Sequence, residues 1–319
     1  MKDKLLRVEV SIIRTFLNID DQNMEILFKG NEGTPVMIVL GMGSSFDEWY
    51  EITETLSKTN RVIMFHRPGL GESELLKELR NTESVINEIS EIIRLLEIDE
   101  PFILVGHSYG GLCVQHFMKK HEEKVLGIVL VDSTSVNFKA LDQLDLPVIN
   151  EDSTDEAWLE KCLFYSSMNE ERLRVQLKPT LTKQQLQFPI DIQKRLLEFQ
   201  VKPNLYKAMY LEISHWERDA ETIKNLNTSL NLPLIVIGRD KAHCISLAVE
   251  EGLPEKEAEL LENKWEELIE GQAYITKNSR LIFAKGSSHS IHLDRPDIIL
   301  EAIRILKGME LEEKNGHIK

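Results

Sequence analysis

Hydrophobic and polar positions along this chain alternate in the pattern of an α/β protein. Short, continuous apolar runs are typical of strands buried on both faces of a parallel sheet. Between them, apolar residues return every three or four positions, which is the spacing of an amphipathic helix. We therefore expect strands at 36–40, 61–65, 102–105, 125–131, 232–238 and 279–284.

The segments between these runs predict the rest of a mostly parallel sheet flanked by helices. Partial alternation on either side of the turn-like residues 18–23 predicts an antiparallel hairpin, 7–16 with 24–29, at the sheet edge. Because strands and helices alternate, the crossovers should be right-handed. The acidic face of the 254–270 helix is expected to be solvated, and 308–319 to be a frayed polar tail. Helices are expected at 47–57, 82–97, 112–121, 254–270 and 297–306.

After the run at 125–131 the alternation stops. Residues 135–231 contain no strong apolar strand run, but 155–165, 191–199 and 205–223 have helical spacing and are rich in aromatic residues. This pattern predicts a core made of 1–134 and 231–319, with a helical insertion at 135–230 between two sheet strands.

Composition and charge narrow the class of partner. The 319 residues are 42% hydrophobic and 29% charged, as in ordinary globular proteins. A net charge of −15 argues against nucleic acid or an anionic membrane as a partner. The first residues lack the apolar core of a signal peptide, and no apolar run approaches a membrane span. The three cysteines lie far apart, so we expect neither disulfides nor a zinc site, and a cytoplasmic location.

One stretch combines a buried strand with a possible nucleophile. The apolar run 102–105 leads directly into Gly106-His107-Ser108-Tyr109-Gly110, a G-x-S-x-G spacing followed by a helical pattern. Glycines on both sides let the strand and the helix approach closely around a strained serine. The helix N-terminus would place partial positive charge beside that serine. The alternative is a glycine-rich strand-to-helix turn with a solvated serine.

In this order, strand, turn and helix resemble the nucleophile elbow of the α/β-hydrolase superfamily, and the resemblance extends over nearly the whole chain. It implies that Ser108 is the nucleophile and that the Tyr109 N–H helps to bind an oxyanion. The glycine-rich residues 41–45 resemble the loop that supplies the second donor, here the Met42 N–H. The family usually has a histidine before this loop, where this chain has Leu40. A plain turn is the alternative interpretation of the loop.

A second family pattern lies after the 61–65 strand. His66-Arg67-Pro68-Gly69 begins a segment that resembles the Asp-Arg-Pro-Gly-x-Gly-x-Ser of many relatives, with His66 in place of the aspartate. We interpret this segment as a structural turn.

The catalytic base is expected after the last strand. A serine hydroxyl needs a base within hydrogen-bond reach, and a third group to orient that base. In the family the chain order is serine, acid, histidine. His289 lies in the loop after the 279–284 strand, where the resemblance places the histidine, and His292 is the alternative.

Two aspartates are candidates for the acid. Asp240 follows the penultimate strand, which is the commoner location in the family, but it stands one residue closer to Gly238 than the usual Gly-x-x-Asp. Asp132 follows the strand before the insertion, a location also used in the superfamily. We favour Asp132 slightly and expect the other aspartate to serve a turn or to cap a helix.

The residues and the resemblance together predict a serine hydrolase that cleaves a small-molecule carboxylic ester, less readily an amide, through an acyl-enzyme. Hydrolysis of a lactone or a carbon–carbon bond on the same scaffold is one alternative, and a ligand-binding or signalling protein with this fold is another. No H-E-x-x-H, Rossmann or P-loop pattern occurs, so we expect no metal and no nucleotide cofactor.

Overall fold

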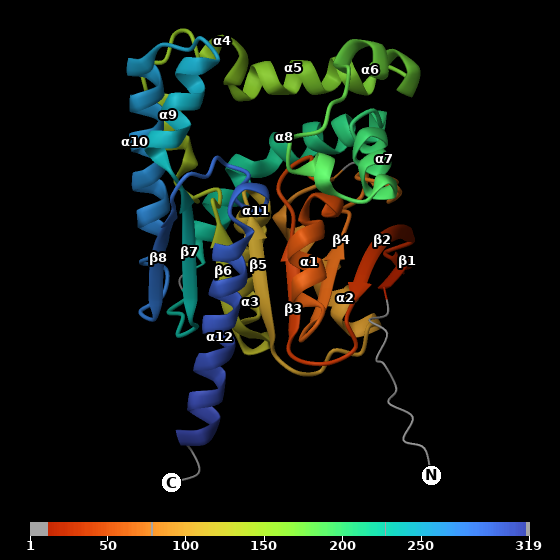
Figure 1. Ribbon diagram of the computed structural model, residues 1–319, viewed down its shortest axis with the longest axis vertical. Coiled ribbons are helices and arrows are strands. Elements are labelled where there is room, and N and C mark those ends of the chain that lie inside the picture. Colours follow the sequence, from red (N-terminus) through yellow and green to blue (C-terminus); the bar gives the residue numbers. More distant parts are fainter. Residues whose placement is uncertain (1–11, 78, 227, 317–319) are drawn as a thin grey trace.

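The computed structural model describes residues 12–77, 79–226 and 228–316, which form an α/β structure around one eight-stranded sheet (Figure 1). The strand order is β1-β2-β4-β3-β5-β6-β7-β8. The two pairs β1–β2 and β2–β4 are antiparallel, and all other neighbours are parallel. The strands are β1 Ile12–Ile19, β2 Gln22–Lys29, β3 Pro35–Val39, β4 Arg61–Phe65, β5 Phe102–His107, β6 Val125–Val131, β7 Leu234–Arg239 and β8 Ser279–Ala284.

The predicted edge hairpin is present, but its turn is tighter than expected. Asp20 and Asp21 alone connect the strands, with φ of 52° and 65°. Two consecutive positive φ values are the requirement of a two-residue turn that matches the strand twist, and aspartate tolerates them. Residues 7–11 of the predicted first strand lie outside the described residues.

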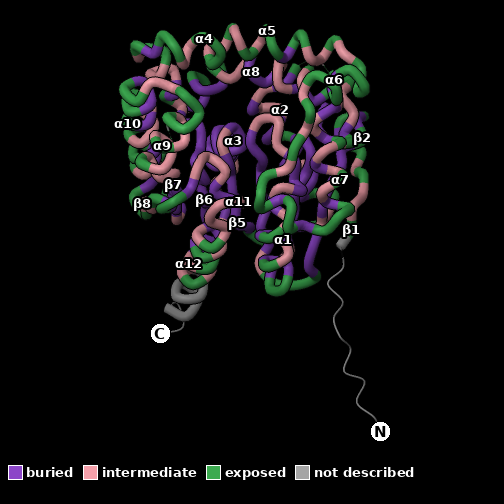
Figure 2. Tube along the Cα trace, turned by 45° about the horizontal axis from the view of Figure 1, so that its top comes forward, coloured by how far each residue is buried: buried purple, intermediate pink, exposed green. Residues whose placement is uncertain are grey.

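Helices cover both faces of the sheet. On one face, α2 (Thr82–Leu95) and α3 (Tyr109–Lys120) pack their apolar sides against the strands. On the other face, α1 (Tyr50–Leu56) and α12 (Pro296–Gly316) do the same. Figure 2 shows that the middle of the sheet is buried between these layers. No helix among the described residues is long and apolar enough to cross a membrane.

The chain between β6 and β7 is helical, as the spacing predicts. In Figure 1 its helices α4, α5 and α6 lie at the top of the molecule, with α8 beneath them. The C-terminal part of α8 joins the main core through Ala220 and Ile223. These elements are η3 Phe138–Gln143, α4 Asn150–Ser153, α5 Asp155–Ser166, α6 Glu170–Leu177, η4 Gln185–Gln187, α7 Ile190–Phe199 and α8 Pro203–Asn225.

Three expectations about helices were wrong. The segment at 47–57 begins as a 3-10 turn, η1 (Phe46–Trp49), before α1. A helix that we did not predict, α9 (Lys241–Glu250), precedes α10 (Glu255–Gln272), because Asp240 caps its first turn. The expected frayed tail continues α12 to Gly316, since the run of strong helix formers after Gly308 outweighs the cost of one glycine.

Close contact between β5 and α3 depends on Gly106. A Cβ added there would lie 2.6 Å from the Gly111 Cα and 2.8 Å from the Gly110 carbonyl oxygen, both backbone atoms. We therefore expect Gly106→Ala to lower the free energy of unfolding by about 1–3 kcal/mol, measured by urea denaturation.

Gly308 provides the matched control for this substitution. It lies within α12, and a Cβ there would meet nothing within 4 Å. Gly308→Ala should raise the free energy of unfolding by about 0.5–1 kcal/mol, because alanine is the better helix former. Equal effects of the two alanines would contradict the close-contact explanation.

Candidate active site

Ser108 lies at a sharp turn between β5 and α3. Its φ of 51° and ψ of −123° are unusual for a residue with a side chain. A Cβ at Gly110 would lie 2.2 Å from the carbonyl oxygen of Val39, so the second residue of α3 has to be a glycine. Ser108 is half-buried at the end of the buried strand. The predicted strand, turn and helix are therefore all present.

Residues 41–45, which we call the oxyanion loop, run directly beside this serine. A Cβ added to Gly41 would lie 3.3 Å from the Ser108 Cβ. Tyr109 is the first residue of α3, so its N–H has no acceptor within the helix. Among the described residues, no backbone carbonyl accepts a hydrogen bond from the N–H of Met42 or of Tyr109. The structure therefore leaves both predicted donors without a backbone acceptor in the part of the chain that it describes.

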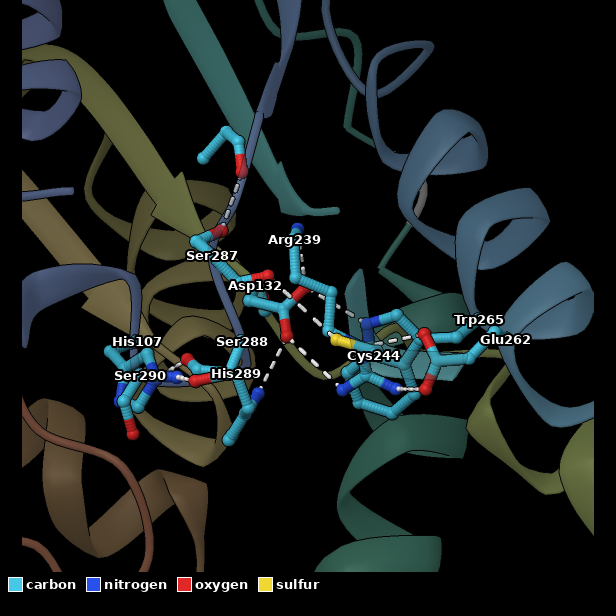
Figure 3. Close-up of polar contacts among 12 residues, drawn as sticks. His107, Asp132, Arg239, Cys244, Glu262, Trp265, Ser287, Ser288, His289 and Ser290 are labelled. Carbon is cyan, nitrogen blue, oxygen red and sulfur yellow. Dashed lines mark hydrogen bonds and ion pairs between the residues drawn. The ribbon is translucent and has the colours of Figure 1, made fainter. Parts of the chain in front are cut away.

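His289 follows β8 and contacts Asp132, which follows β6 (Figure 3). The His289 Nδ1 lies 2.6 Å from the Asp132 Oδ2. Because a carboxylate can only accept, Nδ1 carries the proton and Nε2 is left as the basic nitrogen. The His289 carbonyl accepts a hydrogen bond from the His107 Nε2 at 3.0 Å, which ties the histidine loop to the residue before Ser108.

Asp132 is fully buried, yet it is surrounded by hydrogen-bond donors. Its Oδ1 accepts from the Trp265 Nε1 at 2.9 Å and from the Arg239 N–H at 3.2 Å. The Arg239 guanidinium reaches Oδ2 at 3.3 Å and also pairs with Glu262 of α10. Burial alone would raise the pKa of Asp132, but the charge of Arg239 and the hydrogen bond from His289 outweigh it and lower that pKa to about 2. The carboxylate therefore stays ionised.

The pairing of neighbouring strands explains why these groups meet. Val131 is paired with Ile237 in the parallel β6–β7 ladder, so the residues that follow both strands lie together at the same sheet edge. The backbone N–H of Asp132 donates to the Ile237 carbonyl at 2.7 Å and holds the end of β6 in place.

The structure does not bring Asp240 to His289. Its Oδ1 accepts from the Ala242 N–H at 3.0 Å, and its Oδ2 accepts from the Gly286 N–H at 2.8 Å. The hydrogen bond from Gly286 is the main reason that the pKa of Asp240 is lowered. Asp240 is thus the helix-capping aspartate of the two.

The second candidate histidine, His292, lies in a different environment. Its ring stacks on Trp49 at 4.8 Å, and its nearest carboxylate, Glu48, is 3.7 Å away. Desolvation lowers the pKa of His292 to about 3, so its ring is neutral. Among the described residues, the histidine that is hydrogen-bonded to Asp132 is His289.

His66, the first residue of the turn after β4, is bonded to two other segments of the chain. The His66 Nε2 accepts from the Phe46 N–H at 3.1 Å, so Nδ1 carries the proton and donates to Glu25 at 2.7 Å. The His66 ring also stacks on Phe46 at 3.8 Å. Through His66, these contacts connect Phe46, which follows the oxyanion loop, to Glu25 of β2.

Sequence reasoning missed the groups that hold Asp132. Glu262 belongs to the helix face that we expected to be solvated, but it is buried and paired with Arg239. Arg239 also stacks on Trp265, with 4.4 Å from its Cζ to the ring centre. The signal in the sequence was a basic residue after a buried strand, followed by an acidic helix with one tryptophan.

Comparison with known proteins shows the family of the chain. The model of the α/β-hydrolase fold family matches residues 34–195, about half of the chain. The chain belongs to this family. A relative over most of its length is YqjL of Bacillus subtilis, an uncharacterised protein, which is 21% identical with 86% of this chain and 84% of YqjL covered.

Two further likenesses within the family concern hydrolases. The 2-hydroxymuconate semialdehyde hydrolase of Pseudomonas sp. strain CF600 is 29% identical over 37% of this chain and 43% of that protein. Among solved structures, the Cif epoxide hydrolase of Acinetobacter nosocomialis superposes with a TM-score of 0.65 at 15% identity, covering 92% of this chain and 88% of that one. The structural likeness shows a shared fold.

The lowered pKa of Asp132 predicts a pH-dependent contribution to stability. A folded-state pKa of about 2, below the ordinary 3.8, stabilises the protein above about pH 4, and this contribution is lost as the pH falls toward 2. The gap in unfolding free energy between wild type and Asp132→Asn should shrink by about 1 kcal/mol from pH 5 to pH 3. Urea denaturation at several pH values measures this gap. A constant gap would show that the carboxylate is not stabilised in its ionised form.

Proposed function

We propose that this family member is a serine hydrolase that cleaves small-molecule carboxylic esters, and amides less readily, through an acyl-enzyme on Ser108. The hydrogen bond between His289 Nδ1 and the buried Asp132 is the observation that carries the proposal. It leaves a basic Nε2 on a histidine whose loop is bonded to the residue before the elbow serine. A serine, a base and an orienting acid are the three roles that acyl transfer needs.

In the proposed reaction, the Ser108 oxygen attacks the ester carbonyl carbon while its proton passes to the His289 Nε2. Asp132 stabilises the imidazolium that forms. The N–H groups of Met42 and Tyr109 donate to the oxyanion of the tetrahedral intermediate. The intermediate expels the alcohol, which takes the proton from His289. A water molecule then attacks the acyl-enzyme with His289 again as base, and this releases the acid and restores Ser108.

The helical insertion is proposed to act as a lid over this site. Its longest helix, α8, lies directly against the oxyanion loop: a Cβ on Gly43 would be 2.8 Å from the Met209 Sδ. An apolar side chain in this position would shield the reacting ester from bulk water, which strengthens the hydrogen bonds to the oxyanion.

Covalent labelling tests the nucleophile. A fluorophosphonate probe should label the wild type and should not label Ser108→Ala, detected by in-gel fluorescence. Circular dichroism of both proteins checks that they are folded. An unlabelled, well-folded wild type would refute an activated serine.

Paired aspartate variants test the acid. On a panel of p-nitrophenyl esters, Asp132→Asn should lower kcat by roughly 10³-fold or more, because the histidine loses its orienting charge. Asp240→Asn is the control, since Asp240 caps α9, and its kcat should stay within a few-fold of wild type. Loss of activity mainly in Asp240→Asn would reverse the assignment of the acid.

A second candidate reaction is hydrolysis of a carbon–carbon bond. The likeness to 2-hydroxymuconate semialdehyde hydrolase over 123 residues favours this reaction over lactone hydrolysis. A vinylogous 1,5-diketone included in the ester panel separates carbon–carbon from ester cleavage. Strong probe labelling with no turnover of either substrate class would instead favour a ligand-binding role.

A further inference from the structure

A buried arginine connects the oxyanion loop to the helical insertion. The Arg67 side chain is 1% exposed, and its partner Glu212, on α8, is also 1% exposed. The Arg67 Nη1 donates to the Leu40 carbonyl at 2.7 Å, and its Nη2 donates to the Gly41 carbonyl at 3.0 Å. Its Nε and Nη2 donate to the two carboxylate oxygens of Glu212 at 2.6 and 3.0 Å. One guanidinium therefore spans the two segments.

The bond to the Gly41 carbonyl determines where the Met42 N–H points. No peptide bond among the described residues is cis. In a trans peptide the C=O and N–H groups point in opposite directions. Because Arg67 holds the Gly41 oxygen on its own side, the N–H of Met42, in the same peptide, points away from Arg67.

The side chain of Tyr109, whose N–H is the other proposed donor, lies next to the same guanidinium. The Arg67 Cζ lies 5.1 Å from the centre of the Tyr109 ring, in a cation–π contact. The arginine thus contacts the ring of Tyr109 and the carbonyl of Gly41, which belongs to the same peptide as the Met42 N–H.

We infer that Arg67 is the positioning residue of the oxyanion hole and that Glu212 on α8 holds Arg67 in place. This inference rests on the function proposed above. Arg67 does not touch the substrate; it fixes the orientation of the Gly41–Met42 peptide so that its N–H is preset before a substrate binds. A preset donor stabilises the oxyanion without reorganising during the reaction.

The energetics of buried ion pairs support a positional role. Burial would lower the pKa of Arg67, but the charge and hydrogen bonds of Glu212 outweigh it and raise that pKa, so the arginine remains charged. Replacing both members of a buried pair with apolar residues is often neutral for stability, whereas removing one member is costly. A contribution to folding stability alone therefore does not explain well why this buried ion pair is present.

The pair also joins the oxyanion loop to one particular part of the insertion. Next to it, a Cβ on Gly69 would lie 2.7 Å from the Ala208 Cβ, one helical turn before Glu212 on α8. Helix α8 is therefore held to the Arg67 segment both by the ion pair and by close packing.

The chain offers a matched control pair. Arg80 and Glu88 are also buried and form two hydrogen bonds, but Arg80 has no hydrogen bond to the oxyanion loop among the described residues. The test compares Arg67→Met/Glu212→Leu with Arg80→Met/Glu88→Leu. Arg67→Lys is a third variant, which keeps the charge of the pair but loses the planar set of donors.

The measurement compares hydrolysis of a p-nitrophenyl ester with that of its thionoester, in which sulfur replaces the carbonyl oxygen. Sulfur is the weaker hydrogen-bond acceptor, so thionoester cleavage depends less on the oxyanion donors. Arg67→Met/Glu212→Leu should lower kcat for the ester by about 10²-fold with little change in KM. The ester/thionoester ratio of kcat should fall at least tenfold, whereas the control pair should leave it unchanged.

Several outcomes would overturn the inference. An unchanged ratio in a folded Arg67→Met/Glu212→Leu variant would do so, as would an equal fall in the control variant. If that double variant does not fold, the ester/thionoester ratio of kcat is measured for Arg67→Lys instead, and an unchanged ratio in this variant would overturn the inference.

A crystal structure of the double variant separates this inference from the proposed function. If the wild type cleaves no ester, the proposed function fails, and the positioning role of Arg67 is then tested by this crystal structure alone. A Met42 N–H turned away from Ser108 would support the positioning role, and an unchanged Gly41–Met42 peptide would refute it.

Discussion

A carboxylate removed from water keeps its charge only if hydrogen-bond donors replace the lost hydration. The buried carboxylate of Asp132 has such donors. Arg239, Trp265 and His289 surround it. These donors come from the end of β7, from α10 and from the loop after β8, while Asp132 itself ends β6. One buried charge therefore fixes four segments relative to one another and gives His289 its orientation. Burial alone would raise the pKa of Asp132, and the charge of Arg239 is the largest of the effects that oppose it.

The other half of the site depends on close backbone contacts and on a second buried charge. Gly106 and Gly110 allow α3 to start directly against β3 and β5, which places Ser108 beside Gly41. Arg67 then holds the carbonyls on the far side of the oxyanion loop. Two arginines thus hold different parts of the candidate site: Arg239 contacts the carboxylate of Asp132, and Arg67 contacts the carbonyls of Leu40 and Gly41.

Much of the fold could be predicted because its signals are local. The apolar runs at 61–65 and 125–131 coincide with β4 and β6, since a strand buried on both faces is simply a continuous apolar segment. The run at 279–284 coincides with β8, although this strand lies at the sheet edge and is only partly buried. Ser108 and His289 were located by motif and chain order. The predictions that were wrong depended on contacts between residues distant in the sequence. Glu262 and Arg239, for example, lie 23 positions apart, and hydrophobic periodicity does not indicate that they pair. The two aspartates were almost equally plausible in sequence, because only the β6–β7 register and the cap of α9 distinguish them.

The central claim is that Ser108 forms a covalent acyl-enzyme, and intact-protein mass spectrometry tests it most directly. Wild-type protein mixed with a p-nitrophenyl ester and quenched in acid during turnover should gain the mass of one acyl group. Digestion should place that mass on the peptide containing Ser108, and Ser108→Ala should show neither the adduct nor turnover. Ester hydrolysis that persists in Ser108→Ala, or an acyl group attached to another residue, would contradict the claim.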